Sequence, residues 1–234
     1  MTNFGKIALL LLLCATTVGG FVWLPPAVGF QNPALARIFV FHTPCAMAGY
    51  LASGVAIWYA VRYLAWTRDL GDDIKSKCAL SLALLFWTLT TVTGAIFAKS
   101  QWGQYWNWDP RETAMFLLLL VCLAYFALRA AIDAPARRAT LSAAYAVFAI
   151  IAVPFLSYVL PNQSDSLHPK GVINSRGGLS PEYSLVFWAG TLGLCLVFAW
   201  AWRVQVRLEV LEARVRGREF TPRKVVPVLG ARGN

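Results

Sequence analysis

The sequence predicts an all-α integral membrane protein whose six transmembrane helices form a bundle. Only 14% of its 234 residues are charged, 58% are hydrophobic, and the mean hydropathy is +0.57. A soluble domain would usually be about a quarter charged, so this chain has too little polar surface for a water-soluble fold. Its hydrophobic residues also gather in long runs without charges. Together these observations exclude a soluble globular domain.

Six hydrophobic runs are the predicted membrane spans. A helix needs roughly 17 to 25 largely apolar residues to cross the hydrocarbon core. The predicted spans cover residues 7–24, 38–61, 78–98, 113–128, 139–160 and 183–202. The fourth is short and must take length from the residues before it. Helices are expected because lipid offers no partners for backbone N–H and C=O groups, and the runs are too long for barrel strands.

The net charge of +10 is distributed by membrane side. Most basic residues follow the second and fourth spans or lie in the tail; in the two loops they are Arg62, Arg68, Lys75, Lys77, Arg129, Arg137 and Arg138. The opposite side has Arg37, Lys99, Arg111, Lys170 and Arg176. The positive-inside rule therefore predicts that both termini are cytoplasmic and that loops 23–37, 99–112 and 161–182 face outward. Membrane sidedness explains the charge, so we expect no nucleic-acid partner.

We expect one membrane domain, residues 1–202, followed by a basic cytoplasmic tail, residues 203–234. The loops are too short for a second folded domain. The first run is predicted to be a retained span, because its small-residue cleavage pattern is poor for a secretory signal. In the tail, Leu208, Leu211 and Val215 have helical spacing among arginines. This pattern fits a short amphipathic helix on the membrane surface or a solvated tail near anionic lipid.

The cysteines give no sign of a redox or metal motif. All five lie in predicted spans, at Cys14, Cys45, Cys78, Cys122 and Cys195. No CxxC pair occurs, so a disulfide framework, a thiol redox motif and a zinc site are unsupported. The CxxCH motif that attaches haem in c-type cytochromes is also absent from the sequence.

The predicted outward loop between the third and fourth spans is rich in aromatic residues. Its four rings are Trp102, Tyr105, Trp106 and Trp108. A single tryptophan at a membrane boundary is usually an interfacial anchor. Four rings within seven residues, with Gly103 allowing close backbone approach, instead indicate a flat apolar platform for a large planar ligand.

Asp109 follows the aromatic residues and has a strong structural interpretation. Pro110 comes directly after it, and Glu112 lies three residues after Asp109. This is the pattern of a helix N-cap, a proline at the first helical position and an acidic residue in the first turn. Asp109 is therefore predicted to begin the fourth helix, and Ser180 with Pro181 gives a similar signal for the sixth.

The chain has two histidines, and both map to the predicted outward side. His42 lies in the first turns of the second span, and His168 lies in the loop before the sixth. Taken singly, each fits an ordinary loop or helix-end histidine. Together, at the membrane level of the aromatic loop, they are candidate axial ligands for haem iron, because imidazole is a common iron ligand and ionisable residues within membranes are usually functional.

The sequence Trp-Gly-Gln-Tyr-Trp-Asn-Trp-Asp, with the two histidines and six spans, resembles the haem-handling family of cytochrome c assembly proteins, the CcmC and CcsA group. The resemblance covers nearly all of the chain up to about Trp202. The length and span count are similar to the CcmC branch, which presents haem to a membrane-anchored haem chaperone. The following Asp-Pro-Arg-Glu-Thr looks more like the CcsA synthase branch, which leaves the haem acceptor open.

The resemblance implies a site for haem b that binds transiently and without covalent attachment. It would lie at the outer, periplasmic face of the bacterial cytoplasmic membrane. The residues implied are His42, His168, Trp102, Gly103, Trp106, Trp108 and Asp109. Arg111, Lys170 and Arg176 are candidates to pair with haem propionates, because a cation stabilises a partly desolvated carboxylate. The implied partners are a haem chaperone or apocytochrome c, and other cytochrome c assembly subunits.

Three functions remain open from the sequence. The first is a non-enzymatic component of cytochrome c maturation that binds and delivers haem. The second is a subunit of a cytochrome c synthase, which would need a partner to supply further ligands. The third is a b-type cytochrome subunit of a quinone oxidoreductase, which two histidines near one surface argue against. No P-loop is present, so any ATP dependence would belong to a partner.

Overall fold

The structure, a computed structural model, describes residues 2–168 and 178–215. These residues form helices and loops without strands, and six helical stretches among them are long and apolar enough to cross a membrane. The stretches are Asn3–Trp23, Leu35–Thr67, Leu70–Trp102, Pro110–Ala130, Pro135–Gln163 and Pro181–Val215. The predicted fold class and the number of spans are therefore confirmed.

Several spans combine more than one helical element. The α-helices are α1 (Asn3–Val18), α2 (Phe39–Arg62), α3 (Leu70–Trp102), α4 (Pro110–Ala130), α5 (Pro135–Pro154), α6 (Leu160–Gln163) and α7 (Pro181–Val215). A 3-10 turn, η2 (Leu35–Ile38), precedes α2, and π-helical turns η1 (Gly19–Trp23), η3 (Tyr63–Thr67) and η4 (Phe155–Val159) follow α1, α2 and α5.

The predicted start signals of α4 and α7 are present. The side chain of Asp109 caps α4 by accepting a hydrogen bond from the backbone N–H of Arg111 at 2.9 Å. Pro110 is the first residue of the helix, so the fourth span takes the additional length that its short hydrophobic run required. Helix α7 begins at Pro181, and the backbone carbonyl of Ser180 accepts from Ser184 N–H at 2.8 Å.

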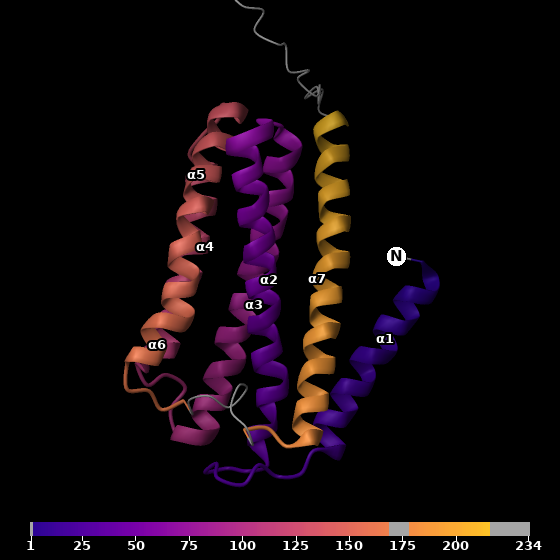
Figure 1. Cartoon of the computed structure of the whole chain (residues 1–234), viewed down its shortest axis with the longest axis vertical. Coiled ribbons are helices and arrows are strands. Elements are labelled where there is room, and N and C mark those ends of the chain that lie inside the picture. Colours follow the sequence, from indigo (N-terminus) through magenta and orange to yellow (C-terminus); the bar gives the residue numbers. More distant parts are fainter. Residues whose placement is uncertain (1, 169–177, 216–234) are drawn as a thin grey trace, which may run out of the picture.

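Helices α2 and α3 form the centre of the bundle. In Figure 1, α4 and α5 lie on one side of this pair and α7 on the other, while α1 leans outward beyond α7. The face of α2 in the core is lined by small residues at every fourth position, which are Ala48, Ala52, Ala56 and Ala60. Small side chains let neighbouring membrane helices approach closely. The resulting α2–α3 pair is the frame on which the site is built.

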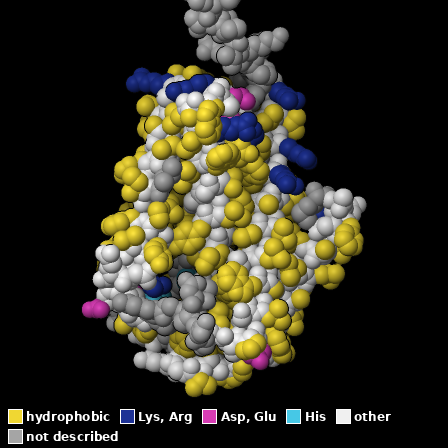
Figure 2. Space-filling view, viewed as in Figure 1, with side chains coloured by type: hydrophobic (Ala, Val, Ile, Leu, Met, Phe, Trp, Pro, Cys, Tyr) yellow, Lys and Arg dark blue, Asp and Glu magenta, His cyan; other side chains and the backbone are white. Residues whose placement is uncertain are grey.

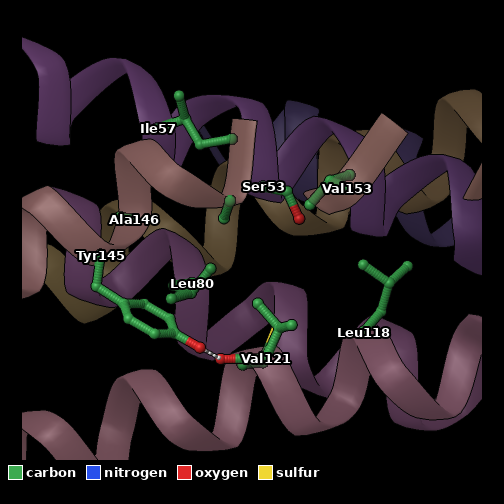
Figure 3. Close-up of a pocket in the computed structure, with 10 residues that line it drawn as sticks. Ser53, Ile57, Leu80, Leu118, Val121, Tyr145, Ala146 and Val153 are labelled. Atoms are coloured by element: carbon green, nitrogen blue, oxygen red, sulfur yellow. Dashed lines mark hydrogen bonds between the residues drawn. The ribbon is translucent and has the colours of Figure 1, made fainter. Parts of the chain in front are cut away.

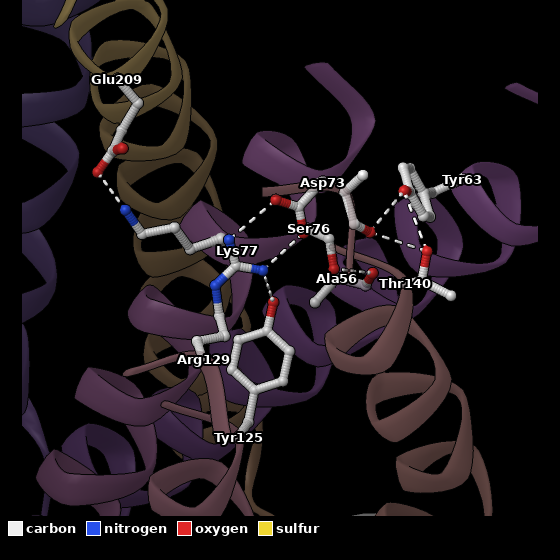
Figure 4. Close-up of polar contacts among 10 residues, drawn as sticks. Ala56, Tyr63, Asp73, Ser76, Lys77, Tyr125, Arg129, Thr140 and Glu209 are labelled. Atoms are coloured by element: carbon white, nitrogen blue, oxygen red, sulfur yellow. Dashed lines mark hydrogen bonds and ion pairs between the residues drawn. The ribbon is translucent and has the colours of Figure 1, made fainter. Parts of the chain in front are cut away.

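One end of the bundle, which we call the basic end, is formed by residues 62–77, 129–138 and the last turns of α7. Lysine and arginine side chains gather there (Figure 2). Asp73 on α3 and Arg129 on α4 form a two-fold ion pair at 2.6 and 2.8 Å (Figure 4). Both side chains are largely buried, and breaking such a pair leaves an uncompensated charge. This contact fixes α4 against α3 far from the aromatic loop.

Residues 203–215 differ from the separate surface helix considered for the tail. They continue α7 without a break as far as Val215. Gln205 and Ser81 exchange hydrogen bonds at 2.9 and 3.1 Å, and Lys77 forms an ion pair with Glu209 at 2.7 Å (Figure 4). These contacts with α3 explain why the helix extends beyond its hydrophobic part. Residues 216–234 of the predicted tail lie outside the described residues.

Candidate functional site

The end of the bundle opposite the basic end contains both histidines, and we call it the aromatic end (residues 101–109 and 166–168, with the start of α2). His42 lies in the first turns of α2 and faces α3. Its Nδ1 atom is 3.0 Å from Oγ1 of Thr93. A Cβ placed at Gly94 would lie 2.9 Å from Cε1 of His42. Glycine at position 94 therefore leaves the space that the imidazole occupies.

His168 is held by Asp109. Its Nδ1 atom is 3.0 Å from Oδ1 of Asp109, whose side chain is almost fully buried. The second carboxylate oxygen accepts from the backbone N–H of Leu167 at 2.6 Å, and Ser166 Oγ donates to Oδ1 at 3.0 Å. Asp109 thus binds residues 166–168 as well as capping α4. The predicted capping role of Asp109 is confirmed, whereas the haem-site role implied by the resemblance stays a prediction.

The hydrogen bonds of Asp109 also determine its charge. Burial by itself would raise the pKa of this carboxyl group, but hydrogen bonds from His168 and from the backbone N–H groups of Arg111 and Leu167 outweigh it. The pKa of Asp109 therefore lies well below its ordinary value of 3.8. An ionised carboxylate can only accept hydrogen bonds. His168 must therefore donate from Nδ1, and in the neutral form of the imidazole the free lone pair is then on Nε2.

The two histidines converge although 126 positions separate them in the sequence (168 − 42). Both lie at the aromatic end, His42 against Thr93 of α3 and His168 against Asp109 at the start of α4. Within the described residues, the side-chain hydrogen bonds of both rings are made through Nδ1. The same residues contain no group of three His, Cys, Asp or Glu side chains that could hold a bare metal ion. A metal bound here would have to bring most of its own ligands.

The aromatic residues of the loop form two groups and not one continuous flat platform. Trp102 packs against His168 with ring centroids 4.8 Å apart. Trp106 instead contacts Trp108 at 5.9 Å and an interplanar angle of 89°. Tyr105 and Trp108 are the exposed rings, with 62% and 74% of their surfaces accessible. Only Trp102 of these rings contacts a histidine.

The backbone of the loop explains this division. Gly103 ends α3 with φ of 81°, and Trp108 has φ of 55°. Left-handed backbone is uncommon for a bulky residue and costs of order 1–3 kcal/mol, which the surrounding structure must offset. Glu112 contributes by accepting from the backbone N–H of Asn107 at 2.7 Å. Trp102 lies before this turn and Trp108 within it, and the two rings have different aromatic partners.

Sequence reasoning missed several residues that shape this end. Gln101 is buried and exchanges hydrogen bonds with the backbone of Asn32 at 3.0 and 3.1 Å, which fastens the loop before α2 to the end of α3. Thr93 and Gly94, which contact His42, stand in a run of threonines and small residues. No feature of that run distinguishes them, because their partner comes from another helix.

Unpaired donors and acceptors also occur at this end. Nε of Arg37 and Nε of Arg111 are buried and have no hydrogen-bond partner among the described residues. Lys170 and Arg176, the other basic candidates, lie outside the described residues. In Figure 2, a hollow in the lower half of the molecule shows a histidine and a basic side chain, bordered by hydrophobic side chains. Imidazole, cation and apolar surface therefore meet in one region.

A small cavity near the middle of the bundle is not a second cofactor site. Its volume is about 10 Å³, roughly what one water molecule requires. Its walls are almost wholly apolar, and Tyr145 directs its hydroxyl away to donate to Val121 O at 3.0 Å (Figure 3). The lining residues include Ser53, Ile57, Leu80, Leu118, Cys122 and Val153. The cavity is a packing defect between α2, α3, α4 and α5.

Comparison with known proteins decides the family. Residues 1–221 match the family of CcmC, Heme exporter protein C. The chain belongs to the CcmC family. The Heme exporter protein C of Bradyrhizobium diazoefficiens is 28% identical over 82% of this chain and 73% of its own length, and that of Paracoccus denitrificans is 26% identical over 86% and 84%. The CcsA protein of Cuscuta reflexa is 35% identical, but over only 29% of this chain and 22% of its own.

Membership of the CcmC family gives the chain a haem-handling role in cytochrome c maturation. The residues at the aromatic end fit such a ligand. Porphyrin supplies four ligands to its iron, so two imidazole nitrogens would be enough to complete a six-coordinate site. The buried Nε donors of Arg37 and Arg111 have the chemistry that carboxylates require. Exposed tryptophan rings at the same end offer apolar surface for a planar macrocycle.

Proposed function

We propose that this CcmC protein binds haem b transiently and without covalent attachment, with His42 and His168 as axial ligands. The observation that carries the proposal is the arrangement of the two imidazoles. Each has its Nδ1 atom engaged by a side chain, Thr93 for His42 and Asp109 for His168, so that Nε2 is the nitrogen suited to bind iron. Metal-bound histidines usually have this arrangement, in which a second residue fixes the ring by its other nitrogen.

The remaining residues of the site have supporting roles in the proposal. Trp102 packs edge-on against His168 and shields that ligand from water. Trp106, Trp108 and Tyr105 offer ring faces to the macrocycle or to the protein that receives it, and Gly103 provides the turn between the two aromatic groups. The Nε atoms of Arg37 and Arg111 are suited to pair with the propionates. When bound, haem supplies the iron centre and the planar hydrophobic surface.

Transient binding requires a site at the membrane surface from which the ligand can leave. We place the aromatic end at the outer, periplasmic face of the bacterial cytoplasmic membrane, and from there haem passes to a haem chaperone or to apocytochrome c. The concentration of lysine and arginine at the opposite end supports this orientation, because basic loops remain cytoplasmic. Both termini are then cytoplasmic, and other assembly subunits would complete the pathway.

The orientation can be tested by labelling single cysteines in intact cells. In a cysteine-free background, Gln104→Cys at the aromatic end should react with a membrane-impermeant thiol reagent, whereas Arg68→Cys at the basic end should react only after lysis. Both positions are exposed or partly exposed, so access to the side chain is comparable. Labelling of residue 68 and not of residue 104 in intact cells would reverse the orientation.

Haem ligation can be tested by the visible absorption spectrum of the purified protein loaded with haem. Two imidazole ligands give a six-coordinate, low-spin iron, so the reduced protein is expected to show a low-spin spectrum. The purified protein should contain no haem attached through thioether bonds, because the sequence has no CxxCH motif. A purely high-spin spectrum would show that at most one of the two histidines binds iron, which contradicts the proposal.

A further inference from the structure

His42 packs against Thr93 and Gly94 of α3, two residues to which no role has been assigned above. We propose that Thr93 and Gly94 are positioning residues for His42: the Thr93 hydroxyl fixes the imidazole as its Nδ1–H tautomer, and Gly94 provides the space that directs Nε2 toward the ligand. This inference rests on the proposed function, in which Nε2 of His42 binds the haem iron.

The direction of the Thr93 hydrogen bond follows from its other contacts. Thr93 Oγ1 lies 2.7 Å from the backbone carbonyl of Leu89 and 3.3 Å from that of Thr90. Carbonyls only accept, so the single hydroxyl proton is directed to them, and most closely to Leu89. The Thr93 oxygen therefore meets Nδ1 of His42, at 3.0 Å, with a lone pair. The imidazole must donate from Nδ1, and its free lone pair is on Nε2.

Gly94 fixes where the ring lies. A Cβ at this position would be 2.9 Å from Cε1 of His42, 3.5 Å from Nδ1 and 3.7 Å from Nε2. The ring edge that carries both nitrogens therefore rests against the glycine. Real Cβ atoms essentially never come within 3.0 Å of a heavy atom outside their own and neighbouring residues, so alanine at position 94 would displace the imidazole. Thr93 and Gly94 together determine the tautomer and the position of one ring.

Each histidine thus has a side-chain oxygen next to its Nδ1 atom, but the two oxygens belong to different chemical groups. Asp109 engages His168 with a charged carboxylate at the start of α4, whereas Thr93 engages His42 with a neutral hydroxyl inside α3. A carboxylate partner makes an imidazole more electron-rich than a hydroxyl does, since the negative charge draws the Nδ1 proton.

The tautomer can be measured directly because the chain has only two histidines. In haem-free His168→Gly protein labelled with ¹⁵N-histidine, every imidazole signal belongs to His42. At pH 8, above the usual titration range of imidazole, the nitrogen shifts should show the Nδ1–H form in the parent and in a Thr93→Ser variant. Thr93→Val keeps the shape but removes the acceptor, and should give a mixture of tautomers. An Nε2–H form in the parent, or an unchanged tautomer in Thr93→Val, would overturn the inference.

Haem retention supplies the second readout. Removing a residue that orients a metal ligand commonly weakens metal binding 10- to 100-fold. With both histidines present, the Thr93→Val and Gly94→Ala variants should therefore bind haem at least about tenfold more weakly than the parent protein. Thr93→Ser keeps the hydroxyl group and should retain haem as the parent does. Thr93→Val should have no further effect once His42 is glycine, because Thr93 acts through that ring.

Matched controls separate positioning from general damage to the helices. Thr91→Val removes a hydroxyl that also bonds within α3, to Trp87 O at 2.9 Å, and Gly54→Ala adds a methyl group where no atom lies within 4 Å. Both controls should retain haem normally. If Thr93→Val matches Thr91→Val in tautomer and retention, the inference fails although His42 can still bind iron. If His42→Gly keeps an unchanged low-spin haem, the proposed function itself fails.

Discussion

Replacing either His42 or His168 with glycine is expected to abolish cytochrome c maturation. These are the only histidines in the chain, so neither has a substitute. Removal of one should leave a gap on one face of the porphyrin and convert the iron from low-spin to a high-spin or water-ligated form. The spectrum of each purified, haem-loaded variant measures this change, and the yield of cytochrome c in cells measures the functional loss.

Free imidazole gives the control for this prediction. Because only the side chain is missing, added imidazole should occupy the gap in each glycine variant and restore the low-spin spectrum at least in part. A variant that had merely lost its fold would not respond. An unchanged low-spin haem in both His42→Gly and His168→Gly would show that these histidines do not bind iron.

The second large effect is expected at Asp109, which serves His168 and α4 at once. Asparagine is as good an N-cap as aspartate, so Asp109→Asn should keep the cap on Arg111 N–H but remove the charge and one of the acceptors that hold residues 166–168. We expect haem retention to fall about 10- to 100-fold while thermal stability stays close to that of the parent. Asp109→Ala should lose retention and also about 1 kcal/mol of stability through the missing cap.

Asp69 offers a matched control, because it caps α3 by the same contact, accepting from Gly71 N–H at 2.9 Å, without touching a histidine. Asp69→Ala should therefore lower stability by a similar amount and leave haem retention unchanged. Equal retention in the parent and in both Asp109 variants would contradict the assigned role of Asp109.

The pH dependence of this contribution follows from the low pKa of Asp109. A carboxyl group whose pKa is depressed on folding stabilises the folded state above its unfolded pKa, and this stabilisation is lost as the pH falls through the lower folded pKa. For Asp109 both values lie at or below about 3.8. Titration of this carboxyl group should therefore change the stability only below about pH 5, and thermal melting of the parent and of Asp109→Asn as the pH is lowered from about 5 measures that loss.

The sequence was sufficient to predict those parts of the structure that depend on local chemistry. Long charge-free runs identified all six spans, because a bilayer requires them. The order Asp109, Pro110, Glu112 identified the start of α4, because capping involves only neighbouring residues. The continuation of α7 to Val215 could not be predicted in this way, since it depends on Lys77 and Ser81 of another helix.

In the candidate site, too, the residue types could be predicted from the sequence but the contacts between helices could not. Its histidines and tryptophans were predicted from residue type and membrane side, but the partners of the histidines were not. Nothing near Thr93 in the sequence indicates that it faces His42, because the packing of α2 on α3 creates that contact. Trp106 and Trp108 are perpendicular and not coplanar, and Trp108 has a left-handed backbone, which sequence patterns rarely indicate outside glycine.

Transfer of haem tests the central claim most directly, since a carrier must release what it binds. The measurement is to mix haem-loaded, purified protein with an excess of purified haem chaperone or of apocytochrome c that bears a CxxCH motif, and to follow the distribution of haem after separation. We expect the low-spin spectrum of this protein to disappear as haem is recovered with the acceptor. Haem that stays bound with every acceptor, and is instead reduced steadily by quinol, would contradict it and favour a b-type cytochrome.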